Sequence, residues 1–103
     1  MSKRISSIEV KCSHGKHEIE FPLDAIIVSA IMRKRGFVQL NYLSSWPEIK
    51  SLLECRTIFI ALPGYAVPDS ITRCRFISTV FDIMYGDESG KQIVVHVFEG
   101  DIL

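Results

Sequence analysis

The sequence predicts a single α+β domain, in which a mixed or antiparallel sheet carries two helices and the elements follow the order ββαβαβ, loop, ββ. Three observations lead to this prediction. Apolar and polar residues alternate with a period of two near both ends of the chain, apolar residues recur at helical spacing over 23–31, and a helix-capping pattern begins at Ser45. A length of 103 residues suits one such domain.

The first predicted element is a β-hairpin centred on residues 15–16, because period-two alternation runs on both sides of them. A two-residue loop with glycine first suits a type II′ turn. That turn would place His14 opposite His17 and Lys11 opposite Glu20. One face of the hairpin is then apolar and consists of Val10, Cys12, Ile19 and Phe21.

The same turn raises the question of a metal site, since Cys12, His14 and His17 fall within six positions. A structural zinc site takes four protein ligands, and His96 would have to supply the fourth from far along the chain. We therefore expect two histidines that flank a turn, with no metal and no other cofactor.

A first helix is predicted between Pro22 and Gly36. The basic residues 33–35 suit the carboxyl end of its dipole, and the glycine suits the position after the cap. Val28 and Met32 lie off the apolar stripe, so this helix meets several neighbours or a second copy of the chain in a homodimer. The stripe itself consists of Leu23, Ile26, Ile27, Ala30 and Ile31.

Residues 37–43 read as a short strand, 44–56 as a second helix and 57–62 as a central strand. Ser45 and Glu48 form a capping box at the start of that helix. The run 57–62 is continuously apolar, which is typical of a strand covered on both faces. The helix residues expected to face inward are Ile49, Leu52 and Leu53.

The last third reads as a loop over 63–70 followed by a hairpin. A helix over 69–84 is the alternative, because Cys74, Ile77, Phe81 and Met84 share a helical face, but the β-branched and aromatic content favours a strand. The expected inward residues are Ile77, Thr79, Phe81, Ile83 and Tyr85, answered by Ile93, Val95 and Val97.

Charge and cysteine content restrict the class of protein. Formal net charge is zero, which argues against a dedicated nucleic-acid binder. Residues 1–56 hold nine Lys and Arg against six Asp and Glu, and residues 57–103 hold three against six, so a basic and an acidic end are expected. Three cysteines cannot all pair, and neither a signal peptide nor a membrane span is seen, so we expect a cytoplasmic protein.

No motif for catalysis stands out. Cys55 precedes Arg56, and Cys74 lies between two arginines, which can lower a thiol pKa. His96 would be the base. A small enzyme that uses Cys74 or His96 is therefore only the third hypothesis.

The favoured hypothesis is a small non-catalytic module that binds one protein partner, possibly a basic one, and most specifically an inhibitor of the immunity or antitoxin kind. The runner-up is a nucleic-acid-binding regulator that uses the basic run Arg33–Arg35. The partner surface is expected around the 63–69 loop and the 86–91 turn, where an aromatic anchor is rimmed by acids. Its predicted residues are Tyr65, Asp69, Asp87, Glu88, Glu99 and Asp101.

Overall fold

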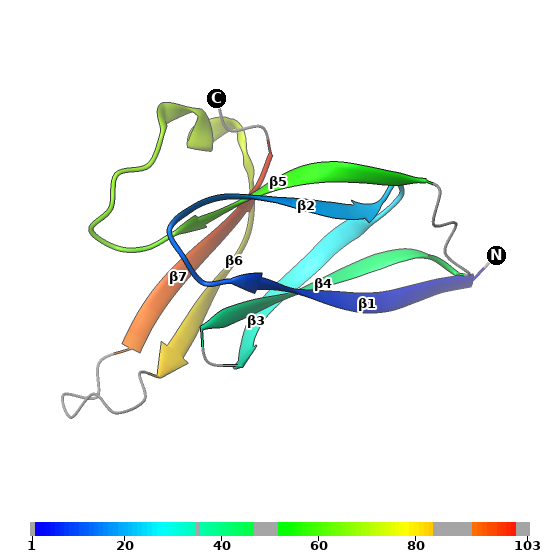
Figure 1. Cartoon of the computed structure of the whole chain (residues 1–103), viewed down its shortest axis with the longest axis horizontal. Helices are drawn as coiled ribbons and strands as arrows, with labels where there is room; N and C mark the ends of the chain where they lie inside the picture. The colour runs from blue at the N-terminus through cyan, green and yellow to red at the C-terminus, as the bar shows by residue number, and fades with distance from the viewer. Residues whose placement is uncertain (1, 35, 47–51, 84–91, 101–103) are drawn as a thin grey trace.

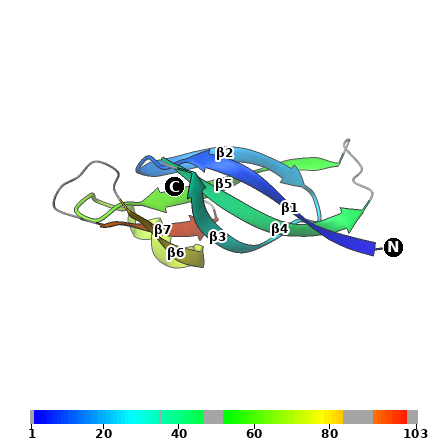
Figure 2. The same ribbon diagram turned by 90° about the horizontal axis from the view of Figure 1, so that it is seen from below.

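The chain forms two antiparallel β-sheets packed face to face, as a computed structural model shows for residues 2–34, 36–46, 52–83 and 92–100 (Figures 1 and 2). Sheet A has three strands in the order β1-β4-β3, and sheet B has four in the order β2-β5-β7-β6. The molecule is flat, with extents of 49 × 30 × 17 Å. The strands are β1 (Ser2–Lys11), β2 (Gly15–Pro22), β3 (Ile26–Lys34), β4 (Phe37–Trp46), β5 (Leu53–Ala61), β6 (Arg75–Ile83) and β7 (Gln92–Glu99).

The core lies between the two sheets and is built by the period-two alternation of the strands. Inward side chains of β4 and β5 are fully buried, whereas their neighbours along each strand point outward. Burial of such aliphatic side chains contributes on the order of 2 kcal/mol each. The buried cluster consists of Val10, Phe21, Ala25, Ile27, Ala30, Val38, Leu40, Ile58, Ile60, Val80, Val95 and Val97.

The α+β prediction is wrong. The only helical segment in the described residues is a 3-10 turn, η1 (Asp69–Arg73). Neither predicted helix is present there, and the fold is an antiparallel β-sandwich. No described helix has the length and apolar character that crossing a membrane requires.

The predicted first helix is instead strand β3, and a β-bulge explains the error. The register between β3 and β4 shifts between Ile27 and Ser29. The extra residue places both Ile27 and Ala30 on the core side, so inward residues recur at a spacing of three, as they do in a helix. Val28 is 49% exposed, and Met32 packs partly against the core. The proposed dimer helix therefore does not exist.

The predicted second helix is replaced by the ends of β4 and β5, with residues 47–51 lying outside the described part. Ser45 does not cap a helix: both its backbone N–H and its hydroxyl donate to the Asp24 carboxylate. Ile49 and Glu48 fall in the undescribed segment. Leu52 and Leu53 are about half exposed rather than inward.

The predicted hairpin between residues 10 and 21 is also wrong in its pairing, although its apolar face is correct. β1 pairs with β4 in sheet A, and β2 pairs with β5 in sheet B. The chain thus crosses between sheets at residues 12–14, where the Cys12 N–H donates to the Gly36 carbonyl at 2.8 Å. Val10 and Phe21 are buried, and Cys12 and Ile19 pack on the core. Alternation defines which face is inward, but it does not choose the partner strand.

The strands predicted for 37–43 and 57–62 are confirmed, and so is the final hairpin of β6 and β7. The predicted inner face of β6 is wrong in part, because a register shift lies between Phe76 and Ser78. Beyond this bulge the alternation is reversed: Val80 is buried, whereas Phe81 is 59% exposed. Residues 69–83 thus begin as a 3-10 turn and continue as a strand, whereas Met84 and Tyr85 lie outside the described residues.

Candidate functional site

The Tyr65 loop, residues 62–68, leaves the end of β5 and is tied down by one histidine. The Leu62 N–H donates to Nδ1 of His14 at 3.1 Å, and Nε2 of the same ring lies 2.9 Å from the Ala66 carbonyl oxygen. Because Nδ1 accepts a hydrogen bond, these partners assign the proton to Nε2, which donates to Ala66. Both ring nitrogens are thus used to hold a loop that is far from His14 in sequence.

Tyr65 is held in place and yet remains exposed. Its ring stacks on the His14 imidazole, with centroids 4.9 Å apart and an interplanar angle of 24°. The His14 ring also makes an edge-on contact to the ring of Phe59, with centroids 5.4 Å apart. Tyr65 nevertheless is 63% exposed. An aromatic ring that is fixed before binding loses little conformational entropy when a partner covers it.

A hollow of about 310 Å³ lies beside this loop. Its walls are mainly apolar, and its one imidazole is that of His96, whose Nδ1 lies 2.8 Å from the Thr79 hydroxyl. The volume is at the lower end of the range for ligand pockets, and the apolar walls suit an apolar group. The lining residues are Ala61, Leu62, Pro63, Gly64, Tyr65, Val67, Ile71, His96 and Phe98.

Exposed aromatic surface continues from the hollow onto β6. Phe98, which lines the hollow, contacts Phe76 with ring centroids 5.4 Å apart, and Phe76 is 53% exposed. Phe76 could not be identified from the sequence, because the bulge that follows it decides which way the residues of the strand point. We define the docking face as Tyr65, Val67, Phe76 and Phe98.

Of the acids predicted to rim the anchor, Asp69 is exposed at the start of η1, directly after the Tyr65 loop. Glu99 is placed differently. Its two carboxylate oxygens lie 3.2 Å from Nη1 of Arg56 and 3.3 Å from Nη1 of Arg75, and only 16% of its side chain is exposed. Asp87, Glu88 and Asp101 lie outside the described residues.

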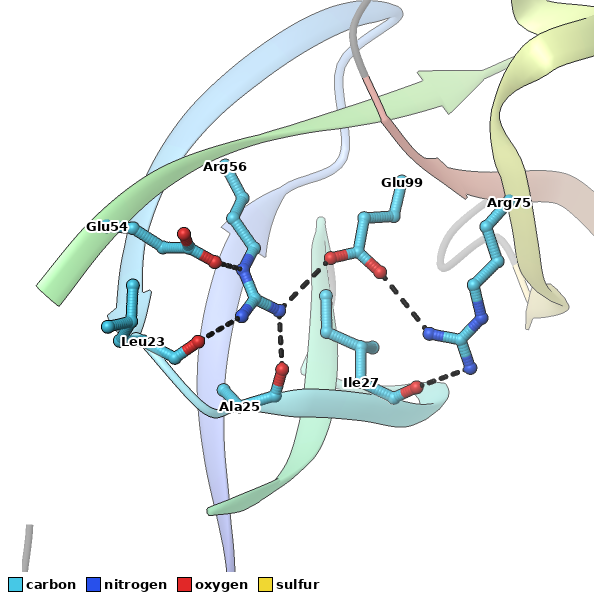
Figure 3. A network of polar contacts seen from close by, with 7 residues as sticks. All are labelled: Leu23, Ala25, Ile27, Glu54, Arg56, Arg75 and Glu99. Carbon is cyan, nitrogen blue, oxygen red and sulfur yellow. Dashed lines mark hydrogen bonds and ion pairs between the residues drawn. The ribbon is translucent and has the colours of Figure 1, made fainter. Parts of the chain in front are cut away.

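Glu99 belongs to an interlayer network, which we define as Glu54, Arg56, Arg75 and Glu99 (Figure 3). The network links sheet B to the beginning of β3 in sheet A. Arg56 donates to the carbonyls of Ala25 and Leu23, and Arg75 donates to the carbonyl of Ile27. Arg56 also pairs with Glu54. An arginine from the basic half of the sequence is thus neutralised by a glutamate from the acidic half.

The thiols are not arranged for nucleophilic chemistry within the described residues. Cys55 is exposed, and its thiol lies 3.3 Å from the Glu18 carboxylate, which accepts its hydrogen bond and raises its pKa, helped by partial desolvation and by the charge of Glu20. Arg56 does not activate it, because the guanidinium turns to the interlayer network. Cys74 is half-buried, with its sulfur 3.6 Å from the Ser70 carbonyl.

The predicted histidine pair at the first turn is separated. His14 serves the Tyr65 loop, and Nε2 of His17 lies 2.9 Å from the Ser13 carbonyl oxygen. Among the described residues, no group of three or more His, Cys, Asp or Glu side chains is placed to hold a metal ion.

Two of the three residues of the predicted basic run, 33–35, lie within the described part of the chain. Arg33 and Lys34 are exposed at the end of β3, and residue 35 is not described. The Lys34 ammonium lies 4.9 Å from the centroid of Phe37, which is paired with Lys11 across the sheet. Two lysines therefore flank one half-buried ring on the outer face of sheet A.

Comparison of the chain with models of protein families, with curated proteins and with solved structures finds no significant match. The functional argument therefore depends on the geometry of these surfaces.

Proposed function

We propose that this protein is a non-catalytic module that binds one protein partner through the docking face. The observation that carries the proposal is Tyr65, an exposed aromatic side chain whose loop is fixed by both nitrogens of His14. Aromatic residues that are anchored beside an apolar pocket are enriched among the residues that dominate protein–protein binding energy.

Two further features support a protein partner. The hollow beside Tyr65 accepts an apolar side chain, and Phe98 joins the hollow to the exposed Phe76. Asp69 adds an acid at the edge of this surface, which favours a partner with a basic rim. The most specific form of the proposal is an inhibitor that covers the active surface of one partner. The cytoplasm is the proposed compartment, supported by three free cysteines.

The test is photo-crosslinking in the cells that produce the protein. A photoreactive phenylalanine analogue placed at Val67 should capture one discrete protein, whereas the same analogue at Ile5, exposed on β1 in the other sheet, should not. Tyr65→Ala in the Val67 variant should abolish capture, since loss of an anchor costs about 2 kcal/mol or more. Tyr65→Phe keeps the ring and should retain most of it.

Equal capture from positions 67 and 5 would contradict the proposal. So would a captured partner whose yield is the same with Tyr65→Ala as with the wild-type residue.

The second candidate function is single-stranded nucleic-acid binding on the outer face of sheet A. The observation that favours it is Phe37 between Lys11 and Lys34, because a ring with flanking cations can stack a base and contact its phosphates. Fluorescence polarisation with a labelled oligonucleotide tests it: Phe37→Ala should weaken binding, and affinity should fall steeply with added salt.

A further inference from the structure

Among the residues that the structure describes, the first half of strand β5 has no partner strand on one side, which we call its free edge. β5 pairs with β2 from Leu53 to Ile60, which is all but the last of its residues, but it pairs with β7 only over Ile58–Ala61. Figure 1 shows β5 running past the end of β7, accompanied on that stretch by β2 alone. Sheet B therefore lacks a strand beside residues 53–57 among the residues that the structure describes.

The direction of the backbone groups on this edge follows from two hydrogen bonds. The Leu52 carbonyl accepts from the Leu23 N–H, on the β2 side, and the Thr57 carbonyl accepts from the Gly100 N–H, on the β7 side. Backbone groups alternate in direction along an antiparallel strand. The N–H and C=O groups of Leu53 and Cys55 therefore point away from β2, as those of Thr57 do.

No described residue pairs with these groups of Leu53 and Cys55. The last described contact of the ladder between β5 and β7 is made by Gly100, which has φ = 147°, a conformation that residues other than glycine rarely adopt. A Cβ at Gly100 would also lie 3.2 Å from the Cα of Cys74, so the bend is fixed against the segment before β6. The described part of the chain after β7 thus ends in a bend at one defined point.

Beside the free edge lies a hollow of about 420 Å³. Residues 54–57 form its β5 side, and Arg75, Glu99 and Gly100 close the end toward β7. Its charged groups balance, with two arginines and two glutamates, so it has no strong preference for an ion. At the other end of the free edge, Leu52 and Leu53 are each about half exposed.

We infer that this half-edge is a docking site for an extended peptide segment of another protein, which adds to sheet B as a strand beside residues 53–57. The chemistry of the edge identifies the occupant, because alternating unpaired N–H and C=O groups are matched by the backbone of another strand. Five residues of strand are about 17 Å long. That length suits one segment better than a folded second copy, since a stable interface buries roughly 800 Å² per partner.

The side chains beside the edge indicate which segment fits. On the outer face of sheet B, the β5 side chains beside an added strand are those of Leu53, Cys55 and Thr57. All three are uncharged, so uncharged peptide residues suit the positions that face them. An apolar residue suits the end near Leu52. This site is separate from the docking face, so its partner need not be the one that Tyr65 contacts.

The probe is a phage-displayed library of short unstructured peptides, selected against the whole protein. Selected peptides are then synthesised with single N-methyl groups. A peptide that adds as a strand directs alternate N–H groups to β5, so methylation at alternate positions should weaken binding by about tenfold or more and at the others by less than about twofold. Amide exchange should slow at Cys55 when the peptide binds.

The matched protein variants are Cys55→Pro and Cys55→Ser. Proline removes the N–H that points to the free edge and leaves the ladder with β2 intact, so the fold should persist while the peptide affinity falls by about tenfold. Serine keeps the N–H and should bind like the wild type. Tyr65→Ala should also bind like the wild type, which separates this site from the proposed function.

Three results would overturn the inference. They are a library that yields no binder, binders with no alternation in the methylation scan, and equal affinity of Cys55→Pro and Cys55→Ser while the melting temperatures of both match the wild type. Concentration-dependent dimerisation that Cys55→Pro abolishes would assign the edge to a second copy instead.

Discussion

The interlayer network and the Tyr65 loop are both held by polar side chains, but the network joins the two sheets and the loop carries an exposed ring. In the network, the Arg56 guanidinium is buried to the point that 16% of its side chain is exposed, and its donors are satisfied by two carboxylates and two carbonyls of the protein itself. In the loop, the polar groups of His14 are also satisfied within the protein, but the ring that they support faces solvent.

The difference shows that the type of a side chain does not decide whether it joins parts of the fold or supports an exposed surface. Charged residues attract attention as site candidates, yet Arg56, Arg75 and Glu99 join the two sheets and leave little for a partner. An imidazole is more often considered as a catalyst or ligand, yet His14 positions an aromatic side chain. Burying a paired charge does not by itself add much stability, but removing one member leaves the others without partners.

The largest expected effect is loss of stability in Arg56→Met. The substitution leaves the carbonyls of Ala25 and Leu23 without the guanidinium donor and removes one of the two arginines that pair with Glu99, so the free energy of unfolding should fall by about 3 kcal/mol. Urea denaturation measures this. Arg56→Lys cannot reproduce the forked contacts and should recover less than half of the loss.

Arg73→Met is the control, because Arg73 is exposed on η1. If Arg56→Lys were as stable as the wild type, the forked geometry would not matter, and the network would be a simple pairing of charges.

A smaller loss is expected in His14→Phe, which keeps an aromatic ring against Tyr65 and removes both hydrogen bonds to the loop. Stability should fall by about 1 kcal/mol, since the freed groups can reach water. Hydrogen exchange should accelerate at the Leu62 amide, with little change in the β4 amides. His14→Ala should lose a further 1 kcal/mol or so through the missing ring contacts. Unchanged exchange at Leu62 would show that the loop is held by other contacts.

The rate at which Cys55 is alkylated tests whether its thiol is activated, as it would be in an active site. The Glu18 carboxylate raises the pKa of this thiol, so less thiolate is present at neutral pH than in an unperturbed cysteine. Glu18→Gln should therefore speed alkylation of Cys55 by iodoacetamide several-fold, measured by mass spectrometry of the modified peptide. Glu9→Gln, on the other sheet, should leave the rate unchanged. Faster alkylation in the wild type than in Glu18→Gln would mean that the thiol is activated after all.

The smallest effect concerns Asp24, next to the turn whose carbonyls Arg56 binds. The Ser45 hydroxyl, then the Ser45 N–H and Lys3, hold the pKa of Asp24 below 3.8 against partial desolvation. A carboxyl with a lowered folded pKa adds stability above its unfolded pKa, and this contribution disappears as pH falls through the folded value.

When the pH is lowered from about 6 to about 3, Asp24→Asn should thus lose less stability than the wild type. The loss in Ser45→Ala should lie between those two. Urea midpoints at several pH values measure it. The prediction fails if all three proteins show the same pH dependence.

Local sequence determined several features correctly. Alternation identified the inward faces of β1 and β2, through Val10 and Phe21, because a period of two is a property of one strand alone. A continuous apolar run identified β5 as covered on both faces, and Phe59 is indeed buried on the outer one, beside His14. The Tyr65 loop was predicted for a local reason as well, since glycine and proline flank it.

Only the tertiary structure decided which strands pair and where their alternation breaks. β1 and β2 each carry an apolar face that fits more than one neighbour, and the longer ladders with β4 and β5 place them in different sheets. The bulge at Ile27–Ser29 brings inward residues of β3 to a spacing of three, which resembles a helix. The bulge at Phe76–Ser78 turns Phe81 toward solvent. Because a bulge depends on the opposing strand, the sequence of the bulged strand carries no periodic pattern that reveals it. For the same reason the sequence does not reveal the contacts that His14 and Arg56 make to residues more than thirty positions away.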